Sequence, residues 1–435
     1  MVAAERPGAQ SGRFFRLNCR PEEVSAVDRM LQAEGFVCSR VPLFNDARIL
    51  EHGPRPLGSS LAAFFGLLYI QDRSSLLPPL CLDPGPGDRV LDMCASPGSK
   101  TGLLSQLVGP SGGVLANEPN RSRLQTLRKN LQILNLVNVV STRFPGQDFP
   151  QTGDQPLHIL CDVPCSGWGT VDRHPRVKSL WTDDRIGPLI DLQRKILGRA
   201  AELLQPGARM VYSTCTTNVR ENEDQVLWAR DSFGLDIQPL PLPEGIVGEP
   251  LQRAEAEGCF RVDGPRSGGQ SFFLGCVTRP GPQPGRPENP ACQERFSLEA
   301  GLGPGLENHA STLASSPACW GNLPAGRLDL VREQVVFVPE GLGALLGPTL
   351  EGSGFPLGRL KKGRFFLSQR ARLLLPRPGD QKELNLEDIT QLHRLVQGQS
   401  LQVASRARLL PLYWRDLPLG WLSVKGTRGL WTDRG

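Results

Sequence analysis

The chain has 435 residues, a length that suits two or three domains. Its 39% hydrophobic and 21% charged residues are typical of a globular protein and exclude a chain that is disordered throughout. The net charge of +5 is unevenly distributed. Residues 327–434 hold 17 Lys or Arg and 10 Asp or Glu, a net of +7, which leaves −2 for the rest of the chain. The basic part predicts either a polyanionic partner such as nucleic acid or only a solvated basic surface.

The first segment, Met1–Arg13, lacks the apolar core of a secretory signal, so we expect a cytoplasmic protein with reduced cysteines. The cysteines number eleven, and no two have the CxxC spacing of a metal site, so we expect no metal and a catalytic rather than a bridging role for any special cysteine. The most apolar run, Leu61–Ile70, is too short to cross a bilayer and predicts a buried helix.

From Arg89 onward, short β-rich runs alternate with helical patterns. The predicted strands are Arg89–Met93, Gly113–Glu118, Val137–Thr142, Leu157–Val163 and Arg209–Thr214. The predicted helices are Thr101–Val108, Arg121–Leu134, Asp184–Leu204 and a helix from about Glu221. Strand–helix alternation at this spacing predicts an α/β fold with a doubly wound parallel sheet.

Beyond this region the composition changes. Thr278–Pro324 contains the runs RPGPQPGRPENP and GLGPG, has little periodicity, and predicts a mobile linker. Leu328–Trp431 has short alternating segments with apolar and aromatic residues, which predict a small mixed α+β or barrel-like domain.

One candidate site is the turn that follows the first predicted strand of the sheet. Its small residues let a ligand approach the backbone, and the next helix offers free N–H groups. The pattern is neither GxxxxGK[ST] nor GxGxxG, so a zwitterionic cofactor such as S-adenosylmethionine fits better than a polyphosphate, with an ordinary strand–helix turn as the alternative. The candidate cofactor residues are Cys94, Ala95, Ser96, Pro97, Gly98, Ser99 and Lys100.

Glu118 ends the second predicted strand of the sheet. A carboxylate at that position can accept two hydrogen bonds from a ribose diol, although a solvated acid at a strand end is common. Its spacing behind the glycine-containing loop favours the ribose contact.

A second candidate site comes from two cysteines at the same sheet edge. Cys165 follows the fourth predicted strand and Cys215 follows the fifth, with Asp162 nearby. A thiolate that adds to carbon 6 of a cytosine activates carbon 5 toward a methyl sulfonium. In that chemistry Asp162 would stabilise the adduct near ring nitrogen 3, and Cys165 would help to remove the carbon 5 proton and release the enzyme.

The alternative for any single cysteine is a small buried hydrophobic residue, the usual fate of a free thiol. We expect that fate for Cys19, Cys38, Cys81, Cys161, Cys259, Cys276, Cys292 and Cys319.

The segments CASPGSKT (94–101), DVPCSG (162–167) and YSTCT (212–216) resemble the signature loops of RNA 5-methylcytosine methyltransferases of the Sun/RsmB/RsmF type. The resemblance extends through RLN (16–18), YIQDRSS (69–75) and NVRENE (218–223), and covers roughly residues 14–280. It implies a Rossmann-like, S-adenosylmethionine-dependent methyltransferase fold.

In that family the cysteine of the TC loop is the nucleophile, which corresponds to Cys215. The cysteine of the PCSG loop assists product release, which corresponds to Cys165. The resemblance also assigns the cofactor to residues 94–100 and Asp162, and its ribose to Glu118.

Two positions depart from the family pattern. Pro145 stands where the family usually has an acid that holds the adenine amino group, and Asp148 is the expected substitute. Trp168 stands where the family commonly has an acid or a small residue, so we expect a different border around the target base.

The segments GFPLGRLKKGRFFLSQ (354–369) and LPLGWLSVKG (417–426) resemble the PUA-like RNA-binding domain of the RsmF-like ribosomal RNA branch. The chain has an acid-free basic run here, made of Arg359, Lys361, Lys362, Arg364, Arg370, Arg372 and Arg377. Such cations would contact RNA phosphates without reading sequence, unless they only form a solvated loop.

These observations predict four parts. They are an N-terminal RNA-contacting α+β region (1–75), a methyltransferase domain (76–280), a Pro/Gly-rich linker (281–324) and a basic PUA-like domain (325–435). We expect a monomer without membrane contact that methylates carbon 5 of an RNA cytosine, in small-subunit ribosomal RNA first and in tRNA second. The rivals are a methyltransferase for proteins or small molecules and an RNA-binding assembly factor that has lost catalysis.

Overall fold

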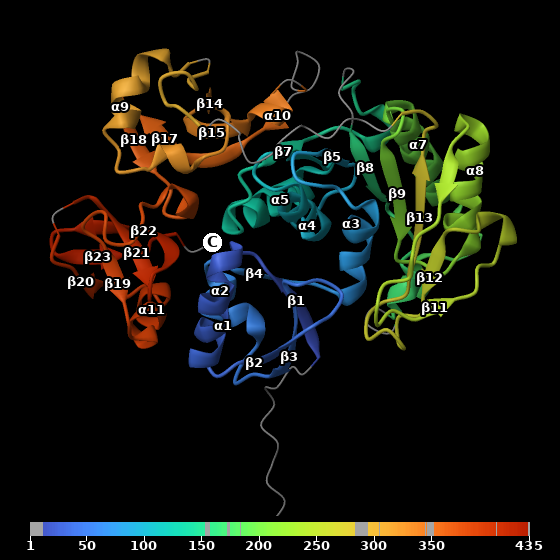
Figure 1. The fold of residues 1–435 in the computed structure, drawn as a ribbon, viewed down its shortest axis with the longest axis horizontal. Coiled ribbons are helices and arrows are strands. Elements are labelled where there is room, and N and C mark those ends of the chain that lie inside the picture. The colour runs from blue at the N-terminus through green and yellow to red at the C-terminus, as the bar shows by residue number, and fades with distance from the viewer. Residues whose placement is uncertain are drawn as a thin grey trace, which may run out of the picture.

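The computed structural model describes residues 12–152, 157–171, 175–182, 184–282, 295–303, 305–343, 345, 352–405 and 407–433. Four β-sheets organise these residues (Figure 1). In this described part, no helix combines the length and the apolar character needed to cross a membrane.

The largest sheet, drawn in teal and green in Figure 1, has the order β11-β12-β13-β9-β8-β5-β6-β7-β16, with β10 beside β13. Its five middle strands pair in parallel, as the alternation predicts. They are β5 (Arg89–Asp92), β6 (Gly113–Asn117), β7 (Val139–Thr142), β8 (His158–Asp162) and β9 (Arg209–Thr214). All five predicted strands are confirmed, with ends that shift by no more than two residues.

The sheet is not wholly parallel, because antiparallel strands extend both sides. On one side they are β10 (Asp236–Gln238), β11 (Gly248–Glu249), β12 (Phe260–Val262) and β13 (Phe272–Thr278). On the other side β16 (Gly352–Ser353) pairs with β7 and brings the C-terminal part of the chain onto the largest sheet.

The helices around this sheet are α3 (Leu77–Leu82), α4 (Ser99–Val108), α5 (Arg121–Ile133), α6 (Val177–Leu180), α7 (Gly187–Leu203) and α8 (Glu223–Phe233). The predicted helix Asp184–Leu204 begins three residues late, at Gly187. Pro188 explains this start, because proline is tolerated in the first turn of a helix but not further inside.

The N-terminal sheet has the order β2-β3-β1-β4. Its elements are β1 (Arg13–Leu17), α1 (Val24–Ala33), β2 (Val37–Arg40), β3 (Ala47–His52), α2 (Leu61–Phe64) and β4 (Leu68–Ile70). The predicted helix over Leu61–Ile70 is therefore wrong after Phe64. Gly66 turns the chain with φ +68°, and a Cβ there would lie 1.9 Å from the carbonyl oxygen of Ile133, so only glycine fits.

The C-terminal part forms two sheets. The first contains β14 (Gly326–Val331), β15 (Gln334–Pro339), β17 (Phe355–Lys361) and β18 (Arg364–Leu367), with α9 (Ala310–Ala314) and α10 (Glu340–Gly343). The second contains β19 (Leu384–Leu386), α11 (Ile389–Val396), β20 (Leu401–Gln402), β21 (Leu409–Trp414), β22 (Leu417–Lys425) and β23 (Arg428–Leu430). The mixed α+β character matches the prediction.

The predicted linker over 281–324 is wrong for residues 295–303 and 305–324. Three apolar side chains are buried there and join the core of the sheet β14-β15-β17-β18: Phe296, Leu306 and Leu313. Widely spaced apolar residues among Pro and Gly can pack in this way without any regular periodicity. Residues 283–294 and 304 lie outside the described residues.

The N-terminal sheet and the second C-terminal sheet share one hydrophobic cluster, so the blue and red elements lie side by side in Figure 1. The rings of Phe65 and Trp431 have centroids 5.2 Å apart. Buried Arg370 donates to the carbonyl of Phe64 at 2.9 Å, and buried Arg372 donates to that of Phe65 at 3.3 Å. The predicted phosphate contacts of these two arginines are therefore wrong, because backbone carbonyls hold their guanidinium groups inside the protein.

Candidate functional site

The carboxyl ends of β8 and β9 bring the two predicted cysteines together. The Sγ atoms of Cys165 and Cys215 lie 3.3 Å apart. Parallel pairing sets this contact, because Asp162 and Ser213 are register partners at the strand ends and each cysteine follows within three residues. Both thiols are partly buried, which makes the pair a site at the sheet edge rather than part of the core.

An ion pair lies beside the sulfur atoms. The Nζ of Lys100 is 2.6 Å from Oδ2 of Asp162, and Oδ1 of Asp162 accepts a hydrogen bond from Ser213 at 2.9 Å. Burial lowers the pKa of Lys100, but the carboxylate of Asp162 outweighs burial and raises this pKa overall. The ammonium group is therefore charged at neutral pH, next to the cysteines.

The two thiols differ in acidity. The hydrogen bond with Cys165 lowers the pKa of Cys215, and the charge of Lys100 lowers it further against the opposing effects of burial and Asp162. The same hydrogen bond, together with burial, raises the pKa of Cys165. Cys215 is the one cysteine with a lowered pKa among the ten described. The site thus offers one thiol that is more acidic than an ordinary cysteine and one that is less acidic.

Glu221, which the sequence reasoning did not single out, ties the two cysteine loops together. Its fully buried carboxylate accepts hydrogen bonds from the backbone N–H of Ser166 at 2.9 Å, the hydroxyl of Ser166 at 2.5 Å and the amide of Gln193 at 2.9 Å. The hydroxyl of Ser166 also lies 2.8 Å from that of Thr216. The only signal in the sequence was its place in the NVRENE segment of the family resemblance.

Gly169 fixes the backbone of the loop after β9, which carries Cys215. Its N–H donates to the carbonyl of Cys215 at 2.9 Å, and a Cβ at this position would lie 2.8 Å from that oxygen. Next to it, the indole of Trp168 donates to the carbonyl of Trp181 at 3.2 Å. The border role expected for Trp168 remains a prediction.

The predicted cofactor loop, residues 94–100, joins β5 to α4. Gly98 has φ +105°, a conformation that favours glycine, and a Cβ there would lie 3.1 Å from Leu127. Below the loop, the carboxylate of Asp92 accepts a hydrogen bond from Thr101 at 2.7 Å, and burial raises its pKa to about 7. The second oxygen of Asp92 is buried and has no hydrogen-bond partner among the described residues. Small residues around an unsatisfied acceptor fit a ligand with a polar head.

Glu118 lies next to this loop. One carboxylate oxygen accepts from the N–H of Asn120 at 2.9 Å, and the other pairs with Arg123 at 3.3 Å. Arg123 also donates to the carbonyl of Ser96 at 3.2 Å and thereby links Glu118 to the loop. Because Glu118 is only 1% exposed, a ribose diol would have to displace the Arg123 guanidinium to reach it.

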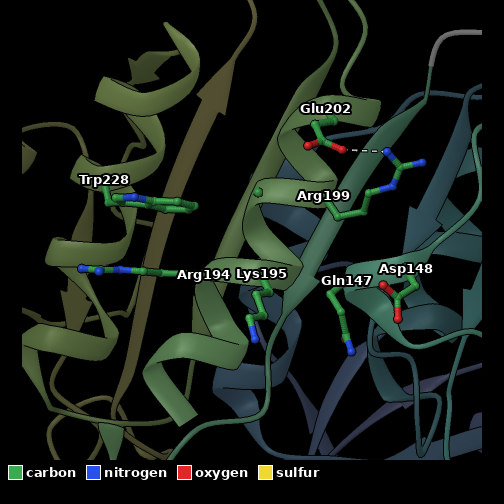
Figure 2. A pocket seen from close by; sticks show the side chains of 8 residues that line it. Gln147, Asp148, Arg194, Lys195, Arg199, Glu202 and Trp228 are labelled. Atoms are coloured by element: carbon green, nitrogen blue, oxygen red, sulfur yellow. Dashed lines mark hydrogen bonds and ion pairs between the residues drawn. The ribbon is translucent and has the colours of Figure 1, made fainter. Parts of the chain in front are cut away.

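Asp148 lines a pocket of about 580 Å³ with Gln147, against α7 and α8, and the lining includes none of residues 94–100 (Figure 2). The rest of its lining is Arg194, Lys195, Gly198, Arg199, Glu202 and Trp228. Pro145 begins the short turn Gly146–Asp148 that places Asp148 there. The adenine contact expected for Asp148 remains a prediction.

The predicted RNA-contacting cations lie on another sheet. Arg359, Lys361, Lys362 and Arg364 are exposed on the hairpin of β17 and β18, and none of them contributes to the cysteine site. Lys361 lies 3.2 Å from Glu333.

Comparison with known proteins gives consistent matches. The family model described as 16S rRNA methyltransferase RsmB/F matches residues 79–245. The ribosomal RNA small subunit methyltransferases F of Salmonella paratyphi A and Salmonella enteritidis are each 33% identical over 279 residues, which are 59% of this chain and 57% of those proteins. The chain thus spans little more than half the length of these curated relatives.

Solved structures agree. A methyltransferase homolog from Pyrococcus horikoshii is 32% identical, with a TM-score of 0.52 over 62% of this chain and 87% of that chain. The NSun6 structure from Pyrococcus horikoshii, solved with SFG, is 19% identical, with a TM-score of 0.53 over 62% of this chain and 91% of that chain, and shows the shared fold.

Proposed function

The chain belongs to the RsmB/F family of ribosomal RNA methyltransferases, and from that premise we propose that it methylates carbon 5 of a cytosine in RNA through a covalent bond to Cys215. The observation that carries the proposal is the pair of sulfur atoms 3.3 Å apart, in which Cys215 has the lowered pKa. Small-subunit ribosomal RNA is the favoured substrate, and tRNA is the second candidate. A monomer suffices, because both cysteines come from one chain.

S-adenosylmethionine, the cofactor of this fold, supplies an electrophilic methyl group. Residues 94–100 would hold its amino acid part, and Glu118 its ribose. The methylated base must be unstacked or single-stranded, because carbon 6 is shielded inside a duplex.

The chemistry of this chain's own residues follows from their placement. The thiolate of Cys215 adds to carbon 6, and the Lys100–Asp162 pair is positioned to supply the proton that ring nitrogen 3 gains. Once Cys215 is bonded to carbon 6, the thiol of Cys165 releases its proton to water. After carbon 5 is methylated, Cys165 accepts the carbon 5 proton, and the bond between carbon 6 and sulfur breaks with its electron pair returning to Cys215. Ring nitrogen 3 then returns its proton to the Lys100–Asp162 pair, and the two sulfur atoms are again the resting pair.

Bisulfite mapping of total RNA from cells with and without the gene tests the proposal. We expect one 5-methylcytosine, or a small set, to disappear from ribosomal RNA and to return with the intact gene but not with Cys215→Ala. If a 5-methylcytosine disappears from tRNA instead, tRNA is the substrate. An unchanged map would contradict cytosine methylation altogether.

Lys100→Met is expected to change the pH dependence of the reaction. Loss of the ammonium group removes a charge that lowers the pKa of Cys215, so this pKa rises and the thiolate forms only at higher pH. The acid limb of the pH profile of kcat/KM should therefore move to higher pH. If it moves by about one pH unit, kcat/KM falls about tenfold at every pH below the pKa of Cys215. Lys195→Met, which removes an exposed cation from α7, is the control and should leave the limb in place.

The two rival functions make different demands on the site. A methyltransferase for proteins or small molecules needs no cysteine pair, so Cys215→Ala would leave it active. An assembly factor without catalysis has no need of a thiolate, whereas Cys215 has a lowered pKa beside a charged lysine.

A further inference from the structure

The outward face of the β17–β18 hairpin carries an aromatic ring among cations. Arg359 is directly opposite Phe366, and Lys361 is directly opposite Arg364. Opposed residues of an antiparallel pair lie on the same face of a sheet. Phe365 points the other way and packs against Trp320, with ring centroids 5.9 Å apart. Phe366 therefore points away from the core and is 53% exposed.

This face continues across the whole sheet. Gln334 on β15 is the register partner of Arg359, and Val331 on β14 is the register partner of Gln334. Val331, Gln334, Arg359 and Phe366 thus form an exposed row over four strands. We call this row, together with Lys361 and Arg364, the hairpin face.

The charge around the hairpin face is strongly positive. The surrounding cations are Arg332, Arg359, Lys361, Lys362 and Arg364, and Glu333 is the acid between the strands, which gives 5 − 1 = +4. Glu333 pairs with Lys361, an exposed contact that contributes little to stability. Among the described residues, Arg359, Lys362 and Arg364 have no carboxylate within 4.0 Å, so they are available to an anionic ligand.

We propose that the hairpin face binds single-stranded RNA, with a nucleobase stacked on Phe366 and adjacent phosphates on Arg359 and Arg364. This inference rests on the proposed function, since it assumes an RNA substrate, and extends it beyond nonspecific phosphate contacts. Cations alone would bind a duplex as readily as a single strand. An exposed ring selects unpaired bases, because a duplex hides the faces that stack. Gln334, beside Arg359 and two strands from Phe366, offers an amide to a base edge.

Binding of labelled RNA to the full chain, followed by fluorescence anisotropy, tests this proposal. Phe366→Ala should weaken binding of a single strand of about ten nucleotides by roughly tenfold and leave binding of the matching duplex unchanged. Phe366→Trp should restore single-strand binding, because it restores a stacking surface. Val37→Ala, which truncates an exposed apolar side chain on β2, is the control.

A second readout separates stacking from folding. A 2-aminopurine in the single strand should be quenched by the wild-type chain and by Phe366→Trp, but not by Phe366→Ala. Equal weakening of single-strand and duplex binding, or no weakening, would overturn the proposal. The Cys215 adduct is assayed separately in Cys165→Ala: its absence from that variant would contradict the proposed function and leave the binding result standing.

Discussion

Cys215→Ala is expected to abolish both methyl transfer and the covalent RNA adduct, whereas Cys165→Ala is expected to accumulate the adduct. The first variant lacks the sulfur that bonds to carbon 6, so the rate should fall by at least about 10³-fold. The second keeps the nucleophile and the positive charge of Lys100 but loses the sulfur that accepts the carbon 5 proton and lets the enzyme leave. Turnover should therefore stop at the bonded stage.

Denaturing gel electrophoresis of chain mixed with RNA and S-adenosylmethionine measures the adduct directly. Cys38→Ala is the matched control, because Cys38 is a half-buried thiol with a raised pKa outside the site. It should turn over normally without trapped RNA. Equal amounts of adduct in Cys165→Ala and Cys215→Ala would refute the assignment of roles.

Glu221→Ala is expected to cause the second largest loss. It removes the acceptor of three hydrogen bonds from Ser166 and Gln193 and leaves buried donors unsatisfied, at about 1–3 kcal/mol for each. The loop after β8, which carries Cys165, and the loop after β9, which carries Cys215, would then no longer be held at a fixed distance from each other. We expect methyl transfer to fall by about 10²-fold or more even at temperatures where the chain stays folded.

Glu223→Ala is the control that distinguishes an effect on the position of the cysteine loops from an effect on the stability of the chain. Glu223 is also buried and pairs with Arg261 at 2.5 Å, but it makes no contact with Ser166 or Gln193. Both variants should unfold at lower urea concentration, and only Glu221→Ala should also change the pH dependence of Cys215 alkylation. A parallel loss of activity in both variants would show that Glu221 acts through stability alone.

The five parallel strands could be predicted because short β-rich runs alternate with helical patterns along the chain, and Leu157–Val163 is the most continuously apolar of these runs. The cysteine pair could be predicted because parallel strands end at one edge, which places Cys165 near Cys215 without any knowledge of side chains. Asp148 could not be placed, because the direction of the turn after Pro145 depends on packing against α7.

The distribution of charged residues predicted the structure less well than the pattern of apolar residues. The run from Arg359 to Arg377 reads as one basic surface, yet Arg370 and Arg372 are buried and Arg359 and Arg364 are exposed. Sequence does not show which guanidinium group will find carbonyl acceptors on a segment some 300 positions away. The role of Glu221 could not be predicted for the same reason, since its partners come from the loop after β8 and from α7.

The contact between Arg372 and Phe65 joins residues 307 positions apart, and this separation constrains how the chain folds during synthesis. Apolar side chains of the N-terminal sheet, Phe65 among them, remain exposed to water until the segment around Trp431 has been made. Because this contact can form only late, folding is slow and an intermediate with exposed apolar surface persists. A chaperone that binds apolar surface would protect this intermediate from aggregation. A catalytic fragment expressed without residues 370–431 should consequently aggregate, even though every residue around the two sulfur atoms is present.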